Sequence, residues 1–124
     1  MNQELDASSD PDVSEVRRLA AAWLAAERTR DISALLEMVT EDAVFLMLGG
    51  RSIAGRPAIE ALYQRFFGSF GVEHEATIAE VRVHGDWAIT WGSERMTLTP
   101  SVGGAPTTLQ GFGMSLLRRG IDRR

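Results

Sequence analysis

The chain has 124 residues, 44% of them hydrophobic and 24% charged, which is the size and composition of one folded domain. Its formal net charge of −4 is a poor match for nucleic acid or for an anionic membrane surface. With no cysteine and only two histidines, the chain is not expected to form disulfides, use thiol catalysis or hold a metal. The acidic start and the lack of a long apolar run predict neither signal peptide nor membrane span, and hence a soluble, cytoplasmic protein.

A long amphipathic helix is predicted near the start of the chain. Residues 1–10 are polar and are expected to be flexible. Asp10 and Pro11 have the order of an N-cap followed by the first helical position. The apolar stripe of this helix runs through Trp23 and reaches Glu27.

Two shorter helices and one strand follow. Asp31 can cap the second helix, and the apolar run at 43–48 has the length of a strand. Pro57 begins the third helix, which Gly68 and Gly71 are expected to end.

The second half of the chain has the period of strands. Segments 76–84, 87–99 and 107–118 alternate in polarity, and Gly85 and Asp86 give a two-residue hairpin turn between the first two. Helices followed by an antiparallel meander predict an α+β fold with the helices packed on one face of the sheet.

The hairpin register predicts a pocket between the sheet and the helices. A two-residue turn places Ala79 opposite Gly92 and Thr77 opposite Glu94, on the same face as Thr90. Small side chains on the helix-facing side are expected to leave space for a ligand.

Glu94 is the candidate catalytic residue, because the register points its carboxylate toward that space. A buried carboxylate is costly unless it is paired. Two other interpretations remain open: the strand has already turned to solvent there, or Glu94 pairs with a nearby arginine. His74 stands between Glu73 and Glu75 in a pattern that resembles a metal cluster, but neighbouring residues on a strand point to opposite faces.

The opposite face of the hairpin is half apolar. Ile89 and Trp91 lie on it, and an exposed tryptophan on a sheet usually has a partner that covers it. We therefore expect a homodimer packed through this face.

Several local patterns, in this order, resemble the SnoaL-like and ketosteroid-isomerase-like branch of the nuclear-transport-factor-two-like superfamily. The resemblance covers about residues 12–119. The matching residues are Trp23, Asp31-Ile32 with Leu35, Thr40-Glu41-Asp42-Ala43-Val44-Phe45, Gly55-Arg56-Pro57-Ala58-Ile59 and Gly85-Asp86-Trp87-Ala88.

The resemblance implies a cone: a strongly curved antiparallel sheet wrapped around three helices, the cystatin-like α+β roll, with an apolar pocket. It implies one domain over 11–124, with an abbreviated final strand, since relatives usually continue after the late strand. Members are frequently dimers that bind or transform small hydrophobic molecules as isomerases, cyclases or hydrolases. Others serve only as association modules, which is the alternative function here.

Ketosteroid isomerase activity is not carried over by the resemblance. Met47 stands where those enzymes have their catalytic aspartate, Trp23 where they have a tyrosine, and Phe112 where they have a second acid. Any chemistry therefore has to use Glu94, with no cofactor. The residues expected to bind the small hydrophobic molecule are Trp23, Met47, Tyr63, Phe67, Thr90, Met96, Phe112 and Met114.

Overall fold

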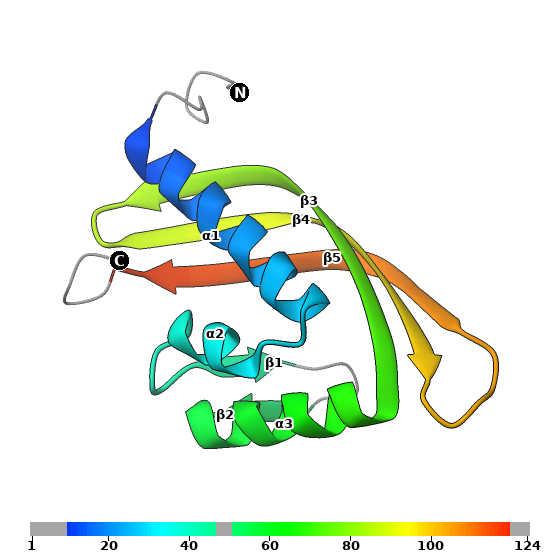
Figure 1. Cartoon of the computed structure of the whole chain (residues 1–124). Helices are drawn as coiled ribbons and strands as arrows, with labels where there is room; N and C mark the ends of the chain where they lie inside the picture. Colours follow the sequence, from blue (N-terminus) through cyan, green and yellow to red (C-terminus); the bar gives the residue numbers. More distant parts are fainter. Residues whose placement is uncertain (1–9, 47–50, 120–124) are drawn as a thin grey trace.

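The computed structural model describes residues 10–46 and 51–119, so Met47 lies outside the described residues (Figure 1). The described helices and strands follow the predicted α+β order, and that fold class is confirmed. None of the described helices is both long and apolar enough to cross a membrane. In chain order the elements are α1 (Pro11–Arg28), α2 (Ile32–Glu37), β1 (Val44–Leu46), β2 (Ser52–Ala54), α3 (Arg56–Ser69), β3 (Phe70–His84), β4 (Trp87–Pro100) and β5 (Thr107–Arg118).

The first two helices begin at the predicted caps. The Asp10 carboxylate accepts hydrogen bonds from the N–H groups of Asp12 and Val13, which satisfies donors that a helix leaves free at its start. The Asp31 carboxylate does the same for Ala34 at the start of α2. The third helix ends at Ser69, so the prediction that Gly71 helps to end it is wrong, because Gly71 already lies in β3.

Three long strands form an antiparallel sheet in the order β3-β4-β5, and α1 crosses one face of it (Figure 1). We call that face, toward α1, the inner face and the opposite one the outer face. The short strand β2, which was not predicted, pairs with β1 in a separate two-stranded sheet. The strand predicted at 76–84 begins earlier, at Phe70, while the predicted strand at 107–118 is confirmed.

A β-bulge at Ala79 changes the predicted register of the hairpin. From the turn to Glu80 and Trp91 the pairs are as predicted, but beyond the bulge Ile78 lies opposite Gly92 and Ala76 opposite Glu94. The predicted pairing of Glu94 with Thr77 is therefore wrong. Because one extra residue shifts the alternation of faces, β3 residues before Ala79 point to the face opposite to the one predicted.

The core lies between the helices and the inner face. Leu35 and Ile59 are fully buried, and Tyr63 and Phe67 of α3 are each 7% exposed. Trp23 and Phe45 pack against this cluster from α1 and β1, with their rings 6.1 Å apart. Aromatic rings at such distances add to the stabilisation that burial provides.

Candidate functional site

A buried carboxylate, Glu27, lies on the apolar stripe of α1. Its side chain is 5% exposed, and both oxygens are hydrogen-bonded to other elements. Glu27 Oε2 accepts from Tyr63 Oη at 3.0 Å and from Trp23 Nε1 at 3.2 Å, while Oε1 lies 2.6 Å from His74 Nδ1. A buried charge is stable only when it is paired in this way.

His74 connects Glu27 to the carboxylate predicted from the sequence. Its side chain is 11% exposed, and its Nε2 lies 3.2 Å from Glu94 Oε1. The ring therefore stands between two carboxylates, one buried on α1 and one on β4. The bulge at Ala79 makes this contact possible, because the predicted register would have pointed His74 to the outer face.

Glu94 points to the inner face, but its side chain is 44% exposed. Its position depends on Gly113 of β5, since a Cβ atom there would collide with Glu94 Oε2. Of the interpretations left open, Glu94 is both paired and partly in solvent, and the charge partner is His74 rather than an arginine.

Burial and nearby charges change the pKa values of His74 and Tyr63 in this cluster. The hydrogen bond to Glu27 raises the pKa of His74, an effect that burial opposes and Glu94 reinforces. Burial, with the Glu27 charge, raises the pKa of Tyr63 above its ordinary value, so the hydroxyl remains a donor. The cluster thus combines a histidine that favours the imidazolium form with an accessible carboxylate.

Four of the residues predicted to bind the ligand lie on the inner side and are buried or half-buried. Tyr63 and Phe67 are core residues, Thr90 is buried at 9% exposure, and Met96 is half-buried beyond Glu94 on β4. The space expected beside Gly92 is filled, because a Cβ there would collide with the backbone of Thr77 and Ile78. The absence of a side chain at Gly92 lets the backbone of the bulged strand approach at this point.

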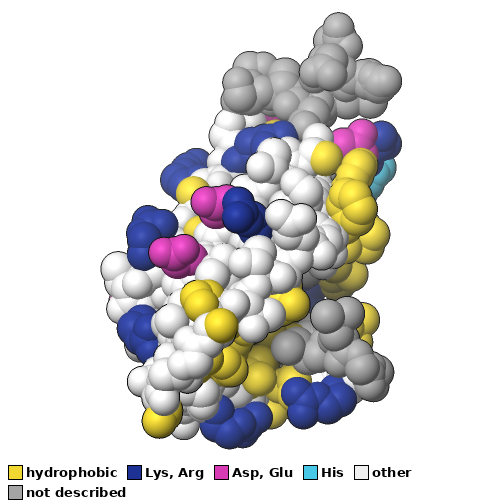
Figure 2. Space-filling view, turned by 90° about the vertical axis from the view of Figure 1, so that its right-hand side faces the viewer, with side chains coloured by type: hydrophobic (Ala, Val, Ile, Leu, Met, Phe, Trp, Pro, Cys, Tyr) yellow, Lys and Arg dark blue, Asp and Glu magenta, His cyan; other side chains and the backbone are white. Residues whose placement is uncertain are grey.

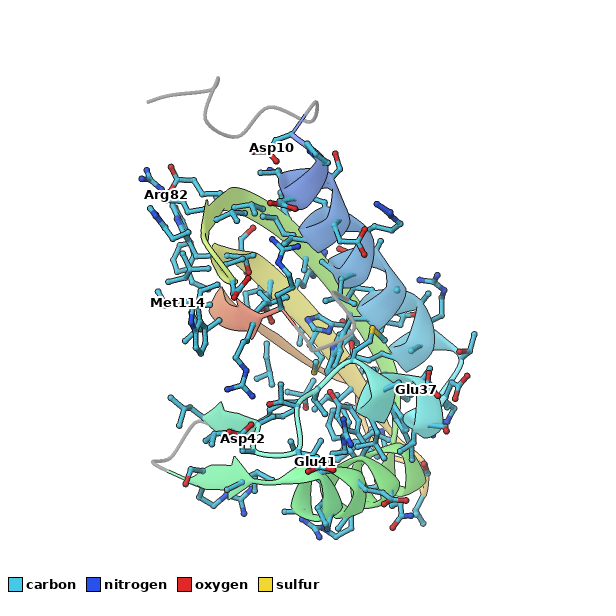
Figure 3. All side chains as sticks on the ribbon, turned by 90° about the vertical axis from the view of Figure 1, so that its left-hand side faces the viewer. Asp10, Glu37, Glu41, Asp42, Arg82 and Met114 are labelled. Atoms are coloured by element: carbon cyan, nitrogen blue, oxygen red, sulfur yellow. The ribbon has the colours of Figure 1, made fainter. Side chains whose placement is uncertain are left out.

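Phe112 and Met114 do not face the inner side, so their predicted place in an interior pocket is wrong. They pair with Ser93 and Trp91 across the β4–β5 ladder, and directly opposed residues share a face. Phe112 is 83% and Met114 71% exposed. Figure 3 shows Met114 on the side of the sheet away from α1.

Apolar side chains form a strip on the outer face, which Figure 2 shows along its right-hand side. We call this set the outer strip, and it contains the predicted Trp91, exposed at 42% and hydrogen-bonded to Glu80. Its exposed members are Trp87, Trp91, Phe112, Met114 and Leu116.

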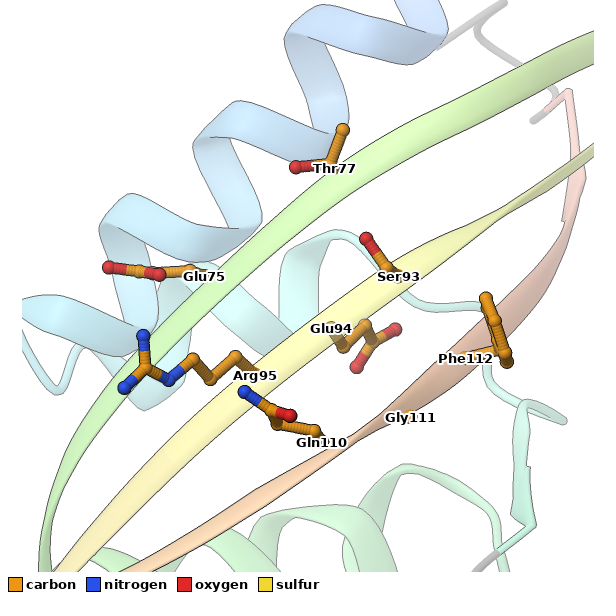
Figure 4. Close-up of a pocket in the computed structure, with 8 residues that line it drawn as sticks. All are labelled: Glu75, Thr77, Ser93, Glu94, Arg95, Gln110, Gly111 and Phe112. Atoms are coloured by element: carbon orange, nitrogen blue, oxygen red, sulfur yellow. The ribbon is translucent and has the colours of Figure 1, made fainter.

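A hollow of about 460 Å³ opens beside one end of the outer strip (Figure 4). Its lining is mostly polar and comes largely from outer-face residues, but it also includes Glu94, the carboxylate that contacts His74. The lining residues are Glu75, Thr77, Ser93, Glu94, Arg95, Gln110, Gly111 and Phe112.

The sequence interpretation missed Glu27 and His74. Glu27 carried a usable signal, since a carboxylate on an apolar helical stripe needs a partner. His74 carried none that a regular hairpin register could reveal. Among the described residues, no group of acidic and histidine side chains is arranged to hold a metal ion.

The sequence and the fold match a known family. The chain belongs to the SnoaL-like domain family, whose model matches residues 20–122. The predicted membership of the SnoaL-like branch of the nuclear-transport-factor-two-like superfamily is thereby confirmed.

Solved structures with the same fold cover nearly the whole chain. A conserved protein from Planctomyces limnophilus DSM 3776 is 29% identical with a TM-score of 0.85, over 90% of this chain and 87% of that one. A ketosteroid isomerase-like protein from Erwinia carotovora atroseptica SCRI1043 is 24% identical, with a TM-score of 0.82 over 92% and 88%. A candidate dehydratase of the NTF2-like family from Streptomyces avermitilis is 19% identical, with a TM-score of 0.76 over 92% and 90%. The search of curated proteins gave no match.

Proposed function

We propose that the protein binds a small, neutral, hydrophobic molecule against the inner face and transforms it by acid–base chemistry that needs no cofactor. The observation that carries the proposal is His74, held between buried Glu27 and half-exposed Glu94. In this arrangement His74 Nε2 and the Glu94 carboxylate can each exchange a proton with a molecule bound beside them.

The charges of the cluster favour a neutral molecule. Two carboxylates and one imidazolium sum to a net negative charge, which repels an anionic substrate. Next to Glu94 on the inner face lie Met96 and Leu109, the latter 45% exposed. A ligand that contacts Glu94 would therefore also cover apolar surface.

The reaction types that the family suggests are isomerisation, cyclisation and hydrolysis. A panel of small apolar ketones, epoxides and esters tests them, with the ring resonances of His74 as the readout of binding. We expect one class to produce a saturable shift at His74 and to be turned over.

The catalytic part of the proposal is tested by two matched variants. Glu94→Gln should reduce turnover by a factor of about 10²–10⁴, the usual effect of losing a general acid or base. Glu75→Gln removes the same charge from the outer face of the neighbouring strand and should not change the rate. If no compound perturbs His74, the proposal is wrong.

The outer strip supports a second candidate function, association of two copies. Its five exposed side chains are all large and apolar and lie on one face of the sheet, and a contiguous patch of this kind marks a site of association. We propose a homodimer packed through this face, around Ile89 and Trp91. A monomeric protein that binds ligands at His74 would favour the first function alone.

A further inference from the structure

The two ring nitrogens of His74 face two carboxylates, and only a protonated ring has a hydrogen for each of them. Nδ1 lies 2.6 Å from Glu27 Oε1, and Nε2 lies 3.2 Å from Glu94 Oε1. A neutral imidazole carries one N–H and one bare lone pair. When the ring loses a proton, one of the two carboxylates faces a lone pair and is repelled.

The two carboxylates differ in their freedom to move away. Glu27 is 5% exposed, and Tyr63 and Trp23 hold its other oxygen, so it cannot turn to solvent. Glu94 is 44% exposed, and within the described ranges its only hydrogen-bond or charge partner is His74. The shorter contact to Glu27 keeps the remaining proton on Nδ1, and Glu94 is the group that is released.

We propose that Glu94 is a latch on His74 that the ring proton controls. With both nitrogens protonated the latch is closed, and Glu94 covers Nε2. When Nε2 gives its proton to solvent, Glu94 swings away, the Nε2 lone pair is uncovered, and the carboxylate becomes free to hydrogen-bond a ligand. The use of the open state rests on the proposed function, whereas the latch itself requires no substrate.

The groups that face His74 come from two elements, and a third element acts on the ring indirectly. Glu27 lies on α1 and Glu94 on β4, while Tyr63 of α3 reaches the ring only through Glu27. Both carboxylates raise the pKa of His74, with Glu27 the larger cause. The latch is therefore expected to open at a pH above the ordinary pKa of histidine, which is about 6.5.

The full chain, labelled with ¹⁵N in histidine and ¹³C in the glutamate carboxyl groups, allows a direct test by NMR titration. We expect neutral His74 to carry its proton on Nδ1, and the Glu94 carboxyl resonance to move at the same midpoint. A neutral ring that keeps its proton on Nε2, or a Glu94 signal that does not follow His74, would overturn the latch.

Two variants provide a second readout. Glu94→Gln removes one favourable charge, so the titration midpoint of His74 should fall, while Glu75→Gln should leave it unchanged. An unchanged midpoint in Glu94→Gln would also contradict the latch. The latch and the proposed function can fail separately. If His74 and Glu94 titrate as expected but no compound perturbs His74, the latch stands and only the proposed function is wrong.

Discussion

Glu27 and His74 are 47 residues apart in the chain, yet Glu27 Oε1 lies 2.6 Å from His74 Nδ1 in the interior. The contact joins α1 to β3 through charged groups rather than apolar packing. Because Tyr63 and Trp23 donate hydrogen bonds to the other Glu27 oxygen, the position of the carboxylate does not depend on its contact with His74. The orientation of the ring, and with it the direction of Nε2, is thus determined by a residue on a different element.

Removal of the Glu27 carboxylate should strongly destabilise the fold. Glu27→Ala leaves the donors of Tyr63, Trp23 and His74 without their shared acceptor, and the loss of one partner of a buried charged pair costs about 3–5 kcal/mol. Urea unfolding monitored by tryptophan fluorescence measures the change. The matched control on the same helix, Glu15→Ala, breaks an exposed pair with Arg18 and should cost less than about 1 kcal/mol. Equal effects would contradict the structural role of Glu27.

The only tyrosine of the chain, Tyr63, gives a direct optical test of the buried network. Burial and the Glu27 charge raise its pKa, so the phenol should not ionise at pH 10, where a free tyrosine does. A raised pKa means that the stability from this group is present below pH 10 and is lost as the pH rises further. Phenolate absorbance should therefore appear together with unfolding, and a separate ionisation near pH 10 in the folded protein would disprove the prediction.

Stability should also fall as His74 loses its proton. The pKa of His74 is raised in the folded state, mainly by Glu27, so the protonated form contributes stability below the unfolded value of about 6.5. That contribution disappears as the pH rises through the folded pKa. Unfolding free energies measured between pH 6 and 9 should decline in the native protein and lose this decline in His74→Asn. His84→Asn, at the exposed hairpin, is the control that should retain it.

The fold was accessible from sequence because its signals are local. Asp10 and Asp31 cap helices through backbone groups two or three residues away, and the Gly85-Asp86 turn fixes the pairs next to it. The site was only partly accessible. Glu94 could be assigned to the inner face from alternation along β4 alone, which no bulge interrupts between Trp87 and Glu94.

His74 could not be assigned, because its face depends on one residue in the middle of β3. Ala79 carries no turn or glycine signal, and its bulge shows only in the pairing of β3 with β4. The one sequence feature related to the bulge is Gly92, because only a residue without Cβ leaves room for the backbone of Thr77 at that point. From the sequence of β4 alone, Gly92 predicts a space for a ligand, because the approach of β3 to it cannot be foreseen.

Association through the outer strip should be sensitive to a single charge at its centre. We expect the native protein to sediment as a dimer at tens of micromolar, an order-of-magnitude choice for a standard interface, and Trp91→Arg to shift it to the monomer without unfolding. Ser33→Arg adds the same charge on exposed α2 and should leave the dimer intact. A native protein that sediments as a monomer would remove the association function.

Two glycines of β5 allow the position of Glu94 to be tested without changing Glu94 itself. A Cβ at Gly113 would occupy the place of Glu94 Oε2, whereas a Cβ at Gly111 meets no atom within 4 Å. Because the Glu94 side chain is half-exposed, the new methyl group in Gly113→Ala should displace it toward solvent at little cost in stability. Replacing a glycine in a strand by alanine should by itself raise the stability of the fold by roughly 0.5–1 kcal/mol. With one partner lost, the pKa of His74 should fall in Gly113→Ala and remain unchanged in Gly111→Ala. If both variants left the His74 titration as it is, Glu94 would not be held over Gly113, and the contact between the two side chains would be wrong.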